Sequence, residues 1–120
     1  MVNDKTVIGL LESAMRAEGL RQQAIAGNVA NMHTNGYRRV DVNFEQVLNE
    51  ALGKTESLDP EKLEVDFFQT KTGSINEFGN DVNLDNETGE MVKNTLKHRA
   101  YMMLLKKKYQ QMDEALRVQA

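Results

Sequence analysis

The chain has 120 residues, a net charge of −3, one proline, and neither cysteine nor tryptophan. Its length suits one domain, so we expect a single unit over residues 1–120. The absence of cysteine excludes a disulfide framework, a cysteine-based zinc site and a thiol nucleophile. Leu, Ile, Val and Phe make up only 29 residues, and so small an apolar supply favours long helices that complete their burial against partners.

Apolar residues recur at intervals of three and four from about residue 6 to residue 32, which predicts an amphipathic N-terminal helix. A second segment over about residues 90–118 has the same spacing. We expect the two helices to pack as a coiled-coil-like pair that presents its remaining apolar surface to neighbouring subunits. The residues predicted for this packing are Leu11, Met15, Ile25, Val29, Met102, Leu105, Tyr109, Met112 and Leu116.

Residues 33–89 lie between the predicted helices and lack a long periodic pattern. Asn35 and Gly36 tolerate positive φ, so they predict a tight turn after the first helix. Residues 40–44 alternate between apolar and polar types and indicate a short extended segment, followed by a short helix over 44–52. Alternation near 63–67 and 82–84 suggests short strands within a loop. The predicted fold class is therefore mainly α, with a short irregular or β-containing middle.

Charge is distributed unevenly along the chain. Residues 1–52 carry −1, residues 53–90 carry −7 and residues 91–120 carry +5. The acidic middle and the basic end are candidate complementary faces between subunits. The basic run Lys106–Lys108 falls within one helical turn, so a solvated face or an acidic neighbour is favoured over nucleic acid.

The sequence contains no constellation typical of an enzyme. Its two histidines, His33 and His98, have no metal-ligating residue one turn away, and the common nucleophile, zinc-protease and phosphate-loop motifs are absent. Residues 81–87 resemble the start of a calcium loop but lack its glycine and its final glutamate. We therefore expect a protein that is not an enzyme, with no cofactor, no metal and no small-molecule substrate.

The chain start lacks the apolar core of a secretory signal peptide, and no segment has the length of apolar residues that spans a bilayer. We expect a protein without a cleaved signal.

The segment Ala30-Asn31-Met32-His33-Thr34-Asn35-Gly36-Tyr37-Arg38-Arg39 resembles the A-N-x-x-T-x-G-Y-[KR]-R signature of the bacterial flagellar axial proteins. Its recurring positions are Ala30, Asn31, Thr34, Gly36, Tyr37, Arg38 and Arg39. The C-terminal helix is similar to the closing helix of the same family. Residues 80–87 match the N-x-V-D-x-x-x-E stretch of a proximal rod subunit, except that Asn83 stands where aspartate is usual.

The resemblance implies a structural subunit of the proximal rod in the flagellar basal body, where axial proteins form a helical tube that transmits torque for motility. It implies type III export without a cleaved signal and a position on the periplasmic side. The implied partners are further copies of the chain, rod proteins of the FlgC, FlgF and FlgG types, an adaptor of the FliE type, the membrane-ring protein and the export apparatus. A rod subunit like FlgC and a helical adaptor or export chaperone of a secretion system remain as alternatives.

Overall fold

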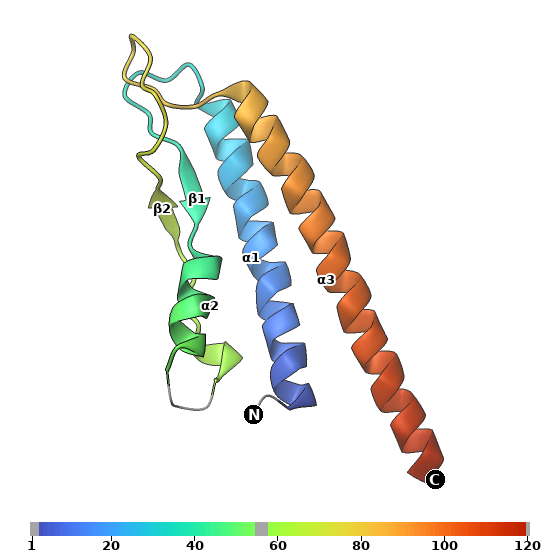
Figure 1. Cartoon of the computed structure of the whole chain (residues 1–120). Coiled ribbons are helices and arrows are strands. Elements are labelled where there is room, and N and C mark those ends of the chain that lie inside the picture. The colour runs from blue at the N-terminus through green and yellow to red at the C-terminus, as the bar shows by residue number, and fades with distance from the viewer. Residues whose placement is uncertain (1–2, 55–57, 120) are drawn as a thin grey trace.

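The computed structural model describes residues 3–54 and 58–119 and has the shape of a flat rod of 66 × 30 × 15 Å (Figure 1). Two long helices, α1 (Asp4–Ala30) and α3 (Leu84–Gln119), lie side by side and run in opposite directions. The segment between them folds against the other side of α1. The mainly helical fold class with two packed terminal helices is confirmed.

Local signals set both ends of α1. The side chain of Asn3 accepts a hydrogen bond of 2.8 Å from the Thr6 N–H and so caps the first turn. At the other end, the Asn31 side-chain amide donates to the Gly27 carbonyl at 2.8 Å, which satisfies one of the last helical acceptors. The helix therefore has nearly the extent that its periodicity predicts.

Helix α3 begins at Leu84 rather than near residue 90. Asn83 accepts a 3.1 Å hydrogen bond from the Asn86 N–H through its side chain, as an N-cap residue does. The strand suggested near residues 82–84 is therefore absent from this stretch, because Leu84 is already helical. At 1.5 Å per residue, α3 is about 54 Å long against about 40 Å for α1. Its C-terminal end consequently extends past the start of α1 (Figure 1).

The middle segment forms a small antiparallel sheet and two short helical elements. Strand β1 (Val40–Val42) pairs with β2 (Phe67–Gln69) in a register that places Asp41 opposite Phe68. Helix α2 (Phe44–Leu52) and the 3-10 turn η1 (Pro60–Lys62) lie between the strands in sequence. The second strand lies slightly after the predicted 63–67 segment.

The core lies where α1 is covered on both sides. Ala14, Ala17, Val42 and Phe44 are buried together, and partly buried apolar side chains surround them. Several of the most deeply buried side chains elsewhere are polar, namely Glu18, Glu87, Asn28 and Asn80. Hydrogen bonding must therefore supply much of the specificity that apolar packing gives a larger core.

The side of α3 that faces α1 differs from the predicted one. Its least exposed positions, spaced by three and four residues, are Glu87, Met91, Asn94, His98, Tyr101, Leu105 and Lys108. The predicted packing residues share Leu105 with this set but name Met102 and Tyr109 where the structure has Tyr101 and Lys108. Three of the inward positions, Glu87, Asn94 and Lys108, are polar and bond to α1, so a search for apolar periodicity selects their neighbours instead.

Candidate functional site

The signature segment forms the turn by which the chain leaves α1. Gly36 has φ +74°, a conformation that costs an L-residue with a side chain about 1–2 kcal/mol. Its N–H donates to the Phe78 carbonyl at 2.8 Å, so the turn is tied to the loop that precedes α3. This observation confirms that the Asn-Gly pair supplies a residue with positive φ.

A buried asparagine joins this turn to the same loop. The Asn80 side-chain amide donates to the carbonyls of Asn31 at 2.9 Å and of Thr34 at 2.8 Å. Its Oδ1 accepts from the Val82 N–H at 2.8 Å, and the Thr34 hydroxyl donates to Asn31 Oδ1 at 3.1 Å. Each polar group of Asn80 therefore has a partner, and the turn and the loop form one unit.

Asn28 stands at the centre of a second set of bonds between α1, β1 and α3. Its Oδ1 accepts from the Tyr37 hydroxyl and the Val40 N–H, each at 2.9 Å. Its Nδ2 donates to the Val40 carbonyl at 2.9 Å and to Glu87 Oε2 at 3.1 Å. The side chain thus pairs with β1 as a neighbouring strand would, and also reaches the first turn of α3.

The two signature arginines bind two buried carboxylates next to this set. Arg39 Nε lies 2.7 Å from Glu87 Oε1, and Arg38 Nε lies 3.2 Å from Asp81 Oδ2. The Arg39 N–H also donates to Asp81 Oδ1 at 2.6 Å. Both carboxylate side chains are fully buried, so each bond forms where water competes little. We call Asn28, Asn80 and these two ion pairs the turn network.

Electrostatics keep Arg39 and Tyr37 each in one protonation state near neutral pH. Burial lowers the pKa of Arg39, but the hydrogen bond and charge of Glu87 outweigh burial and leave that pKa above its ordinary value. Burial raises the pKa of Tyr37, and the Glu87 carboxylate raises it further. The tyrosine hydroxyl therefore keeps its proton and remains a donor to Asn28.

Comparisons with known proteins find similarity that includes the signature turn. The family model for the flagella basal body rod protein matches residues 10–38, which span most of α1 and the signature turn. The flagellar basal body rod protein FlgB of Bacillus subtilis is 25% identical over 115 residues, covering 88% of this chain and 89% of that protein. The FlgB of Buchnera aphidicola is 29% identical over 115 residues, covering 84% and 86%.

The chain is similar to the flagella basal body rod protein family over α1 and the signature turn, and to two FlgB proteins along most of its length. It is a structural component of the rod in the flagellar basal body. In this rod protein the recurring residues of the signature have physical tasks: Gly36 permits the turn, Asn31 caps α1, and Tyr37, Arg38 and Arg39 reach buried acceptors.

A second polar cluster lies further along the rod protein, between α1, β1, α2 and α3. Arg21 bonds Glu18 at 2.6 Å, Asp41 at 2.9 Å and Glu45 at 2.6 Å. Asn94 of α3 donates to Glu18 Oε2 at 2.9 Å and to the Glu18 carbonyl at 2.6 Å. This Arg21 cluster fixes the position of α3 along α1, because the bonds form in only one register.

Direct contacts shift the pKa values of Arg21 and Glu45 in the Arg21 cluster. Burial lowers the pKa of Arg21, but hydrogen bonds with Glu45 and Asp41 and the charge of Glu18 together raise it above its ordinary value. Burial alone would raise the pKa of Glu45, yet the hydrogen bond from Arg21 lowers it overall. Both groups are thus charged near neutral pH.

The residues predicted for helix and subunit packing divide into two groups. Ile25 is buried, and Leu11, Met15, Val29 and Leu105 are partly buried within the chain. Met102, Tyr109, Met112 and Leu116 are exposed, between 41% and 66%, although the Tyr109 hydroxyl still donates to Glu12 of α1 at 3.0 Å. Their role in packing between subunits stays a prediction.

Four site residues were not predicted from sequence patterns, namely Asn28, Glu18, Arg21 and Asn94. A signal existed for Glu18, because it interrupts the apolar seam of the N-terminal helix with a carboxylate. Asn28 and Asn94 gave no comparable signal, since an isolated asparagine in a helix is common on a solvated face. Their partners lie 59 and 76 residues away in sequence, and local patterns do not encode such pairs.

Residues 81–87 have a different use from the calcium loop considered above. Asp81 and Glu87 form ion pairs with Arg38 and Arg39, and Asn83 caps α3. Within residues 3–54 and 58–119, no group of three or more metal-ligating side chains is positioned to hold an ion. The same residues contain no helix with an apolar stretch long enough to cross a membrane.

Proposed function

We propose that this rod protein is a subunit of the proximal rod, where it assembles with other axial proteins into a helical tube that transmits torque. Two FlgB relatives along most of the chain support this position in preference to a FlgC-like one. The proposal includes export without a cleaved signal and a location on the periplasmic side. Its partners are further copies of the chain, FlgC-, FlgF- and FlgG-type rod proteins, a FliE-type adaptor, the membrane ring and the export apparatus.

The exposed apolar side of α3 carries the proposal. Met102, Met103, Tyr109, Met112 and Leu116 are all more than two-fifths exposed. An apolar surface of this kind on a single chain is typical of a protein interaction site. Methionine suits contacts that are not all alike, because its side chain is flexible and polarizable. A subunit that meets different neighbours in a helical tube needs such contacts.

The proposal is structural and not enzymatic. The carboxylates and arginines of the turn network and the Arg21 cluster bond to each other, and among the described residues no buried side-chain nitrogen or oxygen lacks a partner. A reaction would need polar groups directed at a substrate instead. Both clusters serve to hold the two long helices in register.

The test uses a strain whose own copy of the gene is replaced by variants. Leu116→Asp adds a charge on the exposed side of α3, where Leu116 is 66% exposed and contributes little to the isolated fold. We expect normal helicity of the purified chain, loss of the chain from purified basal bodies and loss of swimming. Gln111→Asp adds the same charge at an exposed polar position and should preserve incorporation.

Two outcomes would contradict the proposal. An unmodified chain that stays in the cytosol bound to a secreted client would indicate an export chaperone. Full incorporation and swimming with Leu116→Asp would show that this side of α3 is not an assembly surface.

A further inference from the structure

The end of α3 continues a packing surface beyond the helix that it packs against. Lys108 Nζ bonds to Asp4 Oδ1 at 3.1 Å, and Asp4 is the first residue of α1. The next positions on the same side of α3, at intervals of three and four, are Met112, Ala115 and Leu116. These residues form a small apolar stripe that α1 does not cover. We call residues 109–119 the α3 tail.

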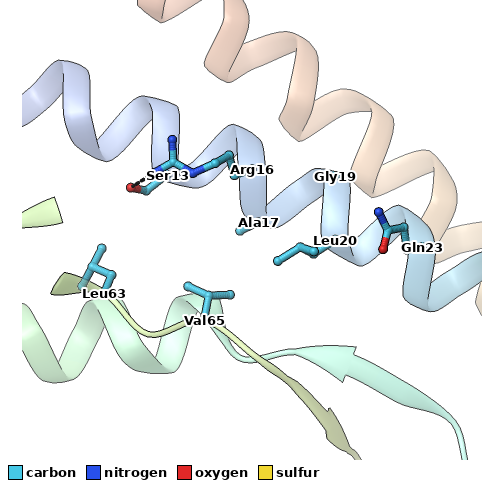
Figure 2. A pocket seen from close by; sticks show the side chains of 8 residues that line it. All are labelled: Ser13, Arg16, Ala17, Gly19, Leu20, Gln23, Leu63 and Val65. Carbon is cyan, nitrogen blue, oxygen red and sulfur yellow. Dashed lines mark hydrogen bonds between the residues drawn. The ribbon is translucent and has the colours of Figure 1, made fainter. Parts of the chain in front are cut away.

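A groove of about 450 Å³ lies on another side of α1. Figure 2 shows it between α1 and the segment that carries Leu63 and Val65, away from α3. Its remaining lining residues are Ser13, Arg16, Ala17, Gly19, Leu20 and Gln23. Ala17, Leu20, Leu63 and Val65 make the lining largely apolar. The groove is open at Gly19, because a Cβ added there would meet nothing within 4 Å. We call this the α1 groove.

The tail and the groove have the same length. From Ser13 to Gln23 α1 rises about 15 Å, and the α3 tail from residue 109 to residue 119 also rises about 15 Å. One apolar side of a helix laid in an apolar groove is a common mode of recognition, with anchors at intervals of three and four residues. Met112, Ala115 and Leu116 supply anchors at those intervals.

Charge supports the same pairing. The guanidinium of Arg16 bonds only to Ser13 Oγ, at 3.1 Å, and no carboxylate of the described residues lies within ion-pair distance of it. In the tail, Asp113 borders the apolar stripe and pairs only with Arg117, at 3.0 Å, with both side chains well exposed. A tail in the groove would bring Asp113 to a cation at its rim.

The tail cannot enter the groove of its own chain. The Lys108–Asp4 bond holds α3 at the first turn of α1, and the straight tail then projects past that end (Figure 1). The groove begins at Ser13, about 14 Å back along α1, on a side that α3 does not face. The occupant must therefore come from another molecule.

We infer that the α3 tail of one copy docks in the α1 groove of a second copy, with Asp113 of the first beside Arg16 of the second. This inference rests on the proposed function as a rod subunit and names the surfaces that meet. Because tail and groove are different surfaces, the contact is heterologous and repeats from copy to copy. Such a contact builds a helical filament when its rotation does not close a ring.

Cysteine cross-linking tests the contact, because the chain has no cysteine of its own. One tagged copy carries Gln23→Cys in the groove and a differently tagged copy carries Ala115→Cys in the tail. We expect a mixed cross-linked dimer in isolated basal bodies and with the purified chain at high concentration. Arg99→Cys, on an exposed side of α3, replaces the groove cysteine in the control and should give no dimer.

Charge reversal supplies the second measurement. Arg16→Glu or Asp113→Arg alone should reduce the cross-link by about tenfold or more, because like charges then meet at the rim. The two reversals together, one in each copy, should restore it. Both sites are exposed, so circular dichroism should show unchanged helicity for each variant.

Three results would overturn the inference. The first is a cross-link that charge reversal leaves unchanged, and the second is a groove cysteine that couples only to a different rod protein. The third is a chain that enters basal bodies normally but gives no cross-link, which would leave the proposed function intact. Absence of the unmodified chain from basal bodies would instead contradict the proposed function.

Discussion

Removing the charge of Glu87 should destabilise the chain more than any other conservative change in the turn network. The Glu87 side chain is fully buried and accepts from Arg39 at 2.7 Å and from Asn28 at 3.1 Å. Glu87→Gln keeps the shape and one acceptor oxygen, so the bond from Asn28 survives. The charge-assisted bond from Arg39 is lost, and the guanidinium is left partly buried without its counter-charge.

The expected cost follows from these contacts. Breaking a fully buried ion pair costs about 3–5 kcal/mol, and a hydrogen bond to a charged group contributes about 1.5–3 kcal/mol. The Arg39 side chain keeps 17% exposure, so water compensates in part, and we expect a loss of about 2–3 kcal/mol. That is a large share of the stability of a domain, which is about 5–15 kcal/mol.

Urea unfolding followed by circular dichroism at pH 7 measures this loss. Asp85→Asn is the matched control, because Asp85 is also an acid in the first turn of α3 but is exposed. It removes only the interaction with the helix dipole, about 0.3–1 kcal/mol. If Glu87→Gln and Asp85→Asn lower the free energy of unfolding equally, the buried pair with Arg39 does not stabilise the fold as reasoned.

Three further predictions concern single positions. Gly36→Val should lower the free energy of unfolding by about 1–2 kcal/mol and impair swimming in soft agar, since φ is +74° there; normal swimming would contradict the role of the turn. Gly19→Ala should stabilise the chain by about 0.5–1 kcal/mol in urea unfolding, whereas Gly9→Ala should give no gain, because its Cβ would lie 2.9 Å from the proline ring of η1. Equal effects of the two alanines would refute that contact. The stability difference between the unmodified chain and Glu45→Gln should be present above about pH 4.3 and vanish as the pH falls through the lowered pKa of Glu45; a constant difference from pH 7 to pH 3 would exclude the ion pair as its source.

Periodicity was sufficient for the large elements. The spacing of three and four residues identified both long helices, and the alternation of Val40 and Val42 identified β1, because these patterns depend on local geometry alone. It failed at the start of α3, where Asn83 provides the cap and a hydrophilic first turn hides the helix. It also predicted Met102 and Tyr109 for the side of α3 that faces α1, whereas the structure has the preceding residues, Tyr101 and Lys108, there.

The polar clusters were beyond prediction from this one sequence. The signature motif marked Arg38 and Arg39 but did not say which carboxylates they bind. Glu87 and Asp81 become partners only when α3 lies against α1, and that arrangement depends on contacts between segments far apart in the chain. A single sequence without relatives aligned to it carries no record of such pairs.

The long sequence separation of these bonds also governs the order of folding. The hydrogen bond between Asn28 and Glu87 joins residues 59 positions apart, and the bond between Glu18 and Asn94 joins residues 76 positions apart. Contacts so distant form late, because the intervening loop must first lose its freedom. In a chain that folds from its N-terminus, the bonds from Asn28 and Glu18 to α3 cannot form until α3 is present. The molecule thus resists folding early, and this property is compatible with the export proposed above.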